Sequence, residues 1–366
     1  MYDDLIYQIA LNEVPHIGDV VAKSLVKIYG TAEAIFKAPL AQLEKIEGIG
    51  TIRARSIKAF KGFDACEEEI GFIEKNKIQP LFVGSDNYPR RLLHCADSPT
   101  LLYYKGTADL NAQKIISIVG TRDHSDYGKH EAEKLLKGLA ATGALIVSGL
   151  AYGIDTIAHR SALKNHLPTL AIVAHGLDRI YPSQNTALAK EIIKDGGILT
   201  EFRKGVEPDR QNFPLRNRIV AGICDALVVI ESGIKGGSLI TAMLANGYNK
   251  DVFALPGKTT DTKSEGCNHF IKTNKALLYT DAADIIQTMG WEEKPVTRKQ
   301  AQRQLFVELS AAEQKIVDAL NQKENIHVDE LCAFTQLSTG AVAAALLNLE
   351  MQNILASMPG KMYKLI

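Results

Sequence analysis

Residues suited to binding an anion follow two apolar runs in the middle of the chain. Gly120-Thr121-Arg122 comes directly after Ile115–Val119, and Ser148-Gly149 comes directly after Leu145–Val147. Glycine lets a backbone approach an anion closely, and the N-terminus of a following helix offers free N–H groups. Arginine adds a donor that can bind a phosphate with two hydrogen bonds. The two turns therefore predict a phosphate-binding edge.

Neither turn matches a dinucleotide-binding motif. The residues after Val119 lack G-x-G-x-x-G, and no acidic residue ends the second run to hold a ribose. A plain connection between a strand and a helix is the alternative explanation for each turn. Asp155 and His159 lie four apart, and capping and packing explain them better than a catalytic pair.

A second candidate for anion binding is Lys235-Gly236-Gly237-Ser238. It follows the most apolar run of the chain, Ala226–Glu231, and precedes an amphipathic helix that Ser238 is expected to cap. The segment is too short for the Walker pattern, since G-x-x-x-x-G-K-[ST] is absent. ATP hydrolysis is therefore not indicated, and we expect neither a cofactor nor a metal.

Residues 201–222 are the most basic segment, and we interpret them as a loop. Phe213 and Asn217 stand among its cations. Charge for phosphates beside a flat aromatic face is what single-stranded nucleic acid requires, and a solvated loop is the alternative. The basic residues are Arg203, Lys204, Arg210, Arg216 and Arg218.

The elements that position these residues alternate between strand and helix. Ile115–Asp155 reads as strand, turn, helix, strand and turn, which predicts two parallel strands of one buried sheet. Further apolar runs extend the pattern, so residues 76–288 predict an α/β domain with an extended, Rossmann-like, mostly parallel sheet. Ligands bind beyond the carboxyl ends of such strands, where both turns are expected.

Residues 1–75 predict a small all-helical domain with a weak repeat. Residues 14–30 match residues 46–62, and the second copy fits a helix-hairpin-helix at Ile46, Gly48, Ile49 and Gly50. The first copy has His16 where glycine is expected. Binding of a DNA phosphate, with Arg53 close by, and simple packing both remain open.

Residues 289–307 are polar and charged, and we interpret them as a linker. Residues 308–366 show three helical patterns and a hairpin-like tail, which is the winged-helix plan. The third helical pattern carries neither Arg nor Lys between Ser338 and Gln352. A protein contact or packing is therefore a better expectation for this module than reading a DNA groove.

Composition narrows the class of protein. Lys and Arg total 42, as do Asp and Glu, so any nucleic-acid surface must be a local patch. Five scattered cysteines without C-x-x-C argue for a reducing compartment and against a zinc site. No signal peptide or long apolar span is visible, and we expect a cytoplasmic protein without membrane contact.

The assembled motifs resemble one family, DNA-processing protein A (DprA, also called Smf). The similarity covers about residues 115–275 in the family's order, and the helical start and winged-helix end also agree with it. The matching stretches are IVGTRDHSDYG, IVSGLAYGIDTIAHRSAL, HGLDRIYPSQN, NFPLRNRIVAG, GGSLITAMLA and VFALPG.

The resemblance implies a non-enzymatic protein that binds single-stranded DNA, dimerises through its Rossmann-like domain, loads the RecA recombinase and displaces single-strand-binding protein. It places the phosphate pocket at Gly120, Thr121 and Arg122, beside a stretch that holds Phe213, Arg216, Asn217 and Arg218. Ser183 stands where some members carry a lysine. Two other functions remain open: a nucleotide-processing enzyme of the lysine-decarboxylase-like group, and a nucleotide-sensing DNA-binding regulator.

Overall fold

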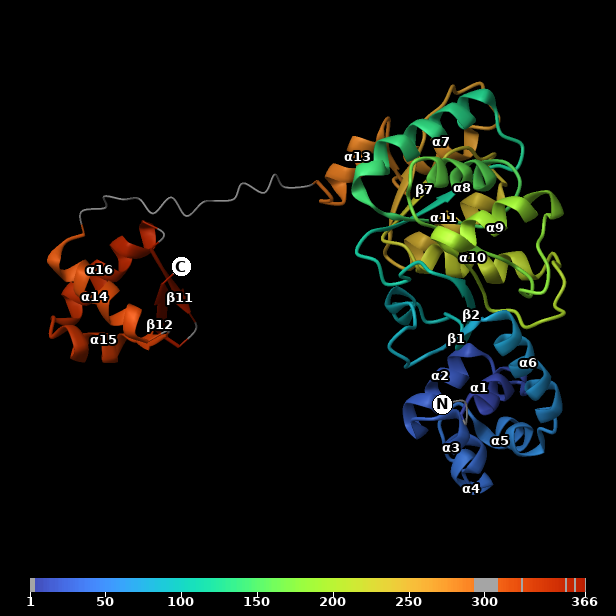
Figure 1. Cartoon of the computed structure of the whole chain (residues 1–366), viewed down its shortest axis with the longest axis horizontal. Coiled ribbons are helices and arrows are strands. Elements are labelled where there is room, and N and C mark those ends of the chain that lie inside the picture. Colours follow the sequence, from blue (N-terminus) through green and yellow to red (C-terminus); the bar gives the residue numbers. More distant parts are fainter. Residues whose placement is uncertain (1–3, 293–308, 324, 353, 359, 366) are drawn as a thin grey trace. The chain divides into compact units, whose positions relative to one another are not determined.

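The structure is a computed structural model that describes residues 4–292, 309–323, 325–352, 354–358 and 360–365. The chain divides into two compact units, Met1–Glu293 and Lys294–Ile366 (Figure 1). Most of the expected linker, residues 293–307, lies outside the described residues. Residues 289–292 belong to the first unit, where Met289 and Trp291 pack against the core.

A nine-stranded sheet forms the centre of the first unit, in the order β1-β2-β6-β5-β4-β3-β7-β8-β9. The seven strands that follow β2 in this order run parallel to one another. At one edge, β2 pairs antiparallel with β6, and β1 pairs antiparallel with β2. The predicted α/β class and mostly parallel sheet are confirmed. The strands are β1 (Gln79–Phe82), β2 (Leu101–Gly106), β3 (Ile115–Val119), β4 (Leu145–Ser148), β5 (Thr169–Ile172), β6 (Gly197–Thr200), β7 (Ala226–Val229), β8 (Asp251–Ala254) and β9 (Leu277–Leu278).

Helices cover both faces of this sheet, so its central strands are apolar on both sides. α7 (Asp126–Leu139), α8 (Ile154–Lys164) and α13 (Ala282–Thr288) pack on one face, and α9 (Thr186–Asp195) continues this layer over β5 and β6. The opposite face carries α10 (Asn212–Gly222), α11 (Gly237–Gly247) and α12 (Glu265–Lys272). Three short 3-10 turns complete the unit: η1 (Arg90–His94), η2 (Ala140–Thr142) and η3 (Ser183–Asn185).

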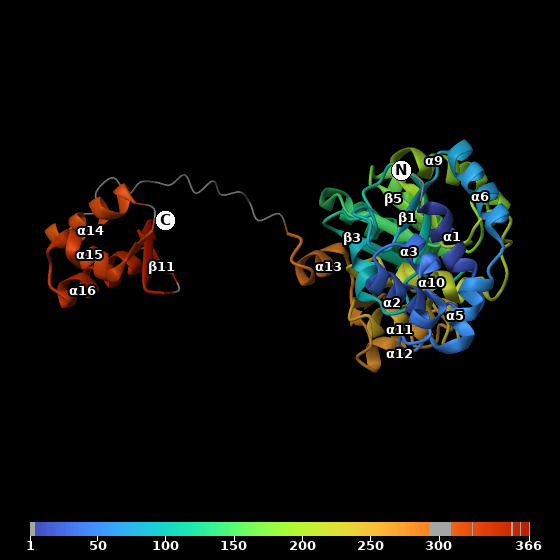
Figure 2. The same cartoon turned by 90° about the horizontal axis from the view of Figure 1, so that it is seen from below.

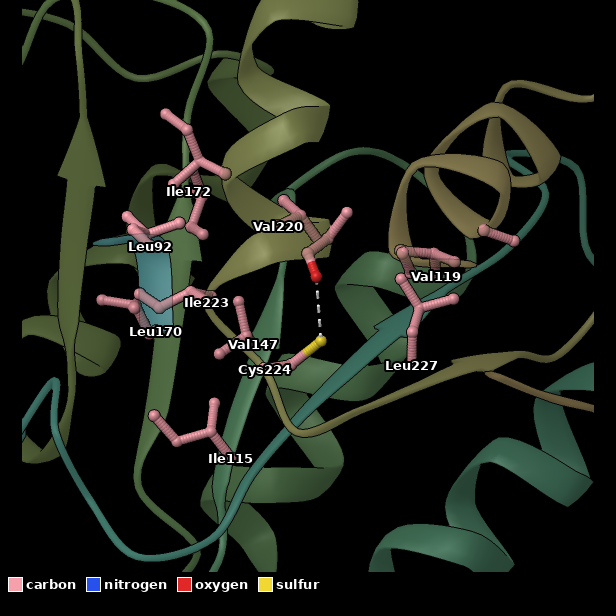
Figure 3. Packing of buried hydrophobic residues seen from close by; sticks show 14 of the residues in the cluster. Leu92, Ile115, Val119, Val147, Leu170, Ile172, Val220, Ile223, Cys224 and Leu227 are labelled. Carbon is pink, nitrogen blue, oxygen red and sulfur yellow. Dashed lines mark hydrogen bonds between the residues drawn. The ribbon is translucent and has the colours of Figure 1, made fainter. Parts of the chain in front are cut away.

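The core beneath α10 shows how strand side chains hold a helix in place. Val147, Leu170 and Leu227 come from three different strands and pack against Val220 and Ile223 (Figure 3). All five side chains are buried. Displacing α10 would therefore expose apolar surface, at about 25 cal/mol per Å².

The amino-terminal segment is helical, as expected, and packs on the antiparallel edge of the sheet. Its core is continuous with Phe82 of β1 and with Leu101 and Tyr103 of β2. Figure 2, seen from below, shows these helices in front of the sheet. They are α1 (Leu5–Glu13), α2 (Asp19–Tyr29), α3 (Ala32–Lys37), α4 (Leu40–Leu43), α5 (Gly50–Ala59) and α6 (Phe63–Asn76).

The two hairpins of the repeat adopt related backbone conformations. His16 has φ +67° and Gly48 has φ +80°, so the histidine occupies the left-handed conformation that glycine occupies in the second copy. Arg53 joins the turns, since its Nε donates to the carbonyl of His16 at 3.1 Å and its Nη1 donates to that of Gly48. These bonds favour packing over phosphate binding for this arginine.

The second unit has the winged-helix elements that the sequence predicts. Apolar side chains such as Ile316, Leu331 and Leu349 form its core. Across the described residues no single helix is long and apolar enough to cross a membrane. The helices Val328–Thr335 and Thr339–Met351 meet the length and composition required only together, as a pair bent by 111°. The elements are α14 (Ala311–Gln322), β10 (Ile326–His327), α15 (Val328–Thr335), α16 (Thr339–Met351), β11 (Leu355–Met358) and β12 (Met362–Leu365).

One element differs from the sequence-based expectation. Residues 201–222 are not a loop throughout, because Asn212–Gly222 forms α10. Pro214 lies in the first turn, where a missing N–H does not interrupt helical hydrogen bonding. At 3.6 residues per turn, Arg216 and Arg218 lie about 200° apart around the helix. The two arginines are therefore presented to different surroundings.

Arg218 joins the helical segment to the sheet. Its Nη2 lies 3.1 Å from Asp19 Oδ2 at the start of α2 and also contacts Oε2 of Glu201, which directly follows β6. Burial raises the pKa of Glu201 to about 7, although the Arg218 charge opposes this. Because the ordinary value is 4.5, the folded protein holds this proton more tightly than the unfolded chain.

This shift predicts how stability depends on pH. The stability that the folded protein gains from holding the Glu201 proton is fully present below about pH 4.5 and is lost as the pH rises through about 7. In Glu201→Gln the amide cannot ionise. We expect the difference in unfolding free energy between this variant and the parent chain to shift in favour of the variant by on the order of 1–3 kcal/mol from pH 5 to pH 8. Urea unfolding at both pH values measures this change.

The matched control is Glu207→Gln, which removes an exposed carboxylate paired with Arg179 at 2.7 Å. This variant should follow the parent chain at both pH values, because exposed ion pairs contribute little. An equal response of the two variants to pH would contradict the assignment to Glu201.

Candidate nucleic-acid interface

The strand order creates a crevice between β3 and β7. Successive strands lead away from β3 through β4 in one direction and from β7 through β8 in the other. Ligands bind at such switch points, beyond the carboxyl ends of the strands. A cleft of about 770 Å³ lies there, lined by residues that follow both strands and by the start of α10.

The turn after β3 is held in place from the β7 side. The backbone N–H of Thr121 donates to the carbonyl oxygen of Glu231 at 2.7 Å. The Glu231 carboxylate is fully buried and accepts from both the backbone N–H and the hydroxyl of Ser125, the residue that caps α7. Sequence reasoning noted Glu231 only as the end of a strand. Its signal was a carboxylate that directly follows an apolar run.

An arginine and an aromatic ring meet at the mouth of the cleft. The Arg122 guanidinium carbon lies 5.2 Å from the centroid of the Phe213 ring. Arg122 is exposed and Phe213 is half-buried. An exposed cation beside an accessible ring can bind a phosphate and stack on a base at the same time.

Arg216 lies deeper in the same cleft and is 5% exposed. Its Nη1 donates to the carbonyl of Ile172, the last residue of β5, at 3.0 Å. Its Nε has no hydrogen-bond partner among the residues that the structure describes. A buried guanidinium N–H without a partner is a donor available to an anion in the cleft.

The Asp155 carboxyl group interacts with the charge of Arg216. Its Oδ2 accepts from the backbone N–H groups of Gly149 at 3.1 Å and Ala151 at 3.3 Å. Burial raises the pKa of Asp155 against the opposing charge of Arg216, and burial likewise lowers the pKa of Arg216. His159 does not pair with Asp155, because its Nδ1 contacts the Thr169 hydroxyl at 2.7 Å. The expected cap is wrong, because Asp155 lies inside the first turn of α8 and Gly153 precedes the helix. Packing therefore explains both residues better than a catalytic pair does.

The third wall of the cleft is the N-terminus of α11. Gly236 precedes the helix, Gly237 begins it, and exposed Lys235 stands next to them. The expected cap at Ser238 is wrong, because Ser238 lies inside the first turn and donates to the hydroxyl of Ser232 at 2.8 Å. This helix end still lines the cleft, and the first N–H groups of a helix have no partner within the helix.

Most of the residues that the sequence singled out line this one cleft. Ser148 does not, since it is buried and donates to the carbonyl of Ile118 at 2.7 Å. Gly149 lies beneath Arg216 and lines a small adjoining recess. Arg218 lies outside the cleft, in the ion pairs with Asp19 and Glu201. The residues brought together are Gly120, Thr121, Arg122, Phe213, Arg216, Asn217, Lys235, Gly236, Gly237 and Ser238.

The adjoining recess contains aromatic residues that sequence reasoning missed. Tyr152 and Tyr181 line it together with Phe213, and the Tyr181 and Phe213 ring centroids lie 6.3 Å apart. Both tyrosines are exposed, at 42% and 43%. The only signal in the sequence was that they stand next to turn residues, Gly153 and Pro182.

The cleft concentrates positive charge in a chain whose net charge is zero. Its lining includes four basic side chains and one acidic side chain, that of Asp155. The Asp155 carboxyl is buried and hydrogen-bonded, whereas Arg122, Arg210 and Lys235 are exposed. A cleft lined by one sign of charge attracts oppositely charged ligands. The arrangement suits a polyanion with flat bases.

Comparisons with known proteins agree with this geometry. The family model described as DNA recombination-mediator protein A matches residues 79–290, and the DprA winged helix domain matches residues 300–361. A helix-hairpin-helix motif matches residues 9–68. Protein Smf of Synechocystis sp. is 33% identical over 393 residues, which cover 98% of both chains. DNA processing protein DprA of Streptococcus pneumoniae is 41% identical over 213 residues, covering 58% of this chain and 75% of that relative.

Two solved structures are also similar. The X-ray structure of DNA processing protein A from Streptococcus pneumoniae has a TM-score of 0.64 at 32% identity, covering 77% of this chain and 97% of that one. DNA processing protein A from Helicobacter pylori, solved to show its single-stranded DNA binding mode, has a TM-score of 0.53 at 32% identity. It covers 58% of this chain and 95% of that one.

The close approach of Gly149 and Arg216 yields a prediction about stability. A Cβ at position 149 would stand 1.6 Å from Arg216 Nη1, so Gly149→Ala must displace the buried guanidinium. We expect a loss of about 1–3 kcal/mol of unfolding free energy, as for other overpacked sites. Urea unfolding measures this loss.

In the control, Gly237→Ala, a Cβ meets no atom within 4 Å, and we expect a change in unfolding free energy within about 0.5 kcal/mol. Equal stability of the two variants would refute the contact.

Proposed function

This chain belongs to the DNA recombination-mediator protein A (DprA/Smf) family, whose members process DNA in recombination, and from that premise we propose that its cleft binds single-stranded DNA. The observation that carries the proposal is the pairing of exposed Arg122 with the Phe213 ring inside a positively charged cleft. Duplex DNA keeps its bases stacked inside, whereas a single strand offers base faces and phosphates together.

We assign the phosphate contacts to three parts of the cleft. Arg122 and the turn after β3 supply one, Arg216 supplies a buried donor, and Lys235 with the N-terminus of α11 supplies another. Phe213 supplies the stacking surface for a base. This set leaves out Arg218, whose guanidinium is already paired with two carboxylates.

The proposed role is binding without turnover of the strand or of a nucleotide. Asp155 is the one carboxyl group in the cleft lining, and it is engaged by two backbone N–H groups beside Arg216. A general base must instead be free to take a proton from a reactant. The nucleotide-processing alternative lacks such a group in the described lining.

Family membership also supports the finer roles that the resemblance implied. We propose that the bound strand is passed to the RecA recombinase in place of single-strand-binding protein, and that two copies associate through the sheet unit. We also propose a cytoplasmic location, because thiols stay reduced there and the five cysteines are free, four of them buried.

The assignment of Arg122 predicts a specific salt dependence. Arg122→Ala should weaken binding to all sequences alike and reduce the slope of log K against log salt by about 0.7, the value for one lost single-strand phosphate contact. Fluorescence anisotropy with labelled oligonucleotides over a range of salt concentrations measures both. Lys190→Ala on α9, outside the cleft lining, is the charge-matched control. An unchanged slope in Arg122→Ala would remove this arginine from the interface.

The assignment of Phe213 makes a different prediction. Phe213→Leu keeps apolar bulk and removes the aromatic face, so it should cost on the order of 1–3 kcal/mol of binding free energy with an unchanged salt slope. The control is Leu215→Ala, at an exposed apolar position on the same helix that does not line the cleft. If Phe213→Leu binds normally and is less stable, the ring serves packing alone.

A further inference from the structure

Helix α10 connects the cleft to the helical segment. Phe213, Arg216 and Asn217 occupy one face at i, i+3 and i+4 and line the cleft. Arg218 leaves from the opposite side and pairs with Asp19 and Glu201. The side chain of Arg218 is 9% exposed, and a buried guanidinium keeps its place only while its partners remain.

We propose that Arg218 is a positioning residue for the cleft: it clamps α10 to α2 and thereby sets how tightly Phe213 and Arg216 hold single-stranded DNA. The Arg218 clamp, formed by Arg218, Asp19 and Glu201, does not itself touch the strand. The amino-terminal helices thus act on DNA binding through α10. This inference rests on the proposed function and concerns the regulation of the same cleft.

The α2 side of the clamp is firmly attached. Asp19 Oδ1 accepts from the backbone N–H of Thr100 at 2.8 Å and from its hydroxyl at 3.1 Å, while Oδ2 faces Arg218. One turn later, Lys23 Nζ donates to the carbonyl of Ala96 at 2.7 Å and to the Ser98 hydroxyl at 3.0 Å. The clamp therefore holds α10 against a helix that is itself fixed to the chain leading into β2.

The cleft side of α10 is attached just as specifically. Arg216 reaches the Ile172 carbonyl, and its guanidinium lies over Gly149 with no room for a side chain there. Val220 and Ile223 pack on the strands. Because Phe213, Arg216 and Arg218 stand within two turns of one helix, a shift of α10 at Arg218 would also move the two cleft residues.

The test is Asp19→Asn in the full chain. The amide oxygen can still accept from Thr100, but the negative charge that holds Arg218 is lost. We expect single-stranded DNA to bind about two- to thirtyfold more weakly, with an unchanged slope of log K against log salt, since no phosphate contact is removed. Asp19→Glu should restore affinity, and hydrogen exchange of the α10 amides should be faster in Asp19→Asn than in the parent chain.

A matched control breaks a different link between the same parts. Arg203 Nη1 and Glu13 Oε2 lie 3.4 Å apart and join the helical segment to the stretch before α10, without contacting α10 itself. Glu13→Gln removes that ion pair and should leave affinity unchanged. If it weakens binding as much as Asp19→Asn does, the clamp has no special role.

Tighter binding of single-stranded DNA by Asp19→Asn would point to a rival explanation. If Arg218 bound phosphate directly, neutralising Asp19 would free its guanidinium, and binding would become tighter with a steeper salt slope. That result, or an unchanged affinity, would overturn the inference. If Asp19→Asn does not fold, Arg218→Gln takes its place in the same assay: weaker binding with an unchanged salt slope is expected, and a reduced slope would show a direct phosphate contact and overturn the inference. Arg122→Ala tests the proposed function separately. If it weakens binding and reduces the salt slope, the proposed function stands whatever the Asp19 variants show. If it changes neither, the proposed function is refuted.

Discussion

The adjacency of β3 and β7 in a buried parallel sheet is the constraint on which the site depends. Both strands end at the same edge, and the chain leaves them toward opposite faces of the sheet. No helix can fill the space between two connections that diverge, so a crevice remains there. Glu231 joins the two sides through buried hydrogen bonds to the turn after β3. These bonds hold the turn after β3 against the end of β7.

Charge in the cleft follows from burial as much as from composition. The chain as a whole is neutral, yet the exposed side chains of Arg122, Arg210 and Lys235 face one cleft. Among the described lining residues the one carboxyl group, on Asp155, is buried and hydrogen-bonded to N–H donors. Since its charge is compensated by Arg216 and the backbone, the cleft presents a positive surface to the solvent. Interactions with a polyanion in such a site weaken with added salt.

The winged-helix unit has a different electrostatic character. Between Glu308 and Ile366 the chain has four lysines, seven acidic residues and no arginine. On α16, where a groove reader presents basic side chains, Leu347 and Met351 are 58% and 75% exposed. The module therefore shares a fold with DNA readers without their charge, which favours a contact with protein over one with a nucleic-acid groove.

The sequence by itself determined which segments become strands and which glycine turns follow them. β-branched runs such as Ile115–Val119 and a helical spacing of apolar residues are local signals, and they also carried the family resemblance. Local signals failed at residues 212–222, where Pro214 and scattered arginines suggested a loop and the chain forms α10. That single difference sends Arg216 into the cleft and Arg218 toward Asp19, about 200 residues earlier in the chain. Only the tertiary structure decided this division, because strand order and helix packing bring distant residues together, and no property of two neighbouring arginines reveals which partner each will meet.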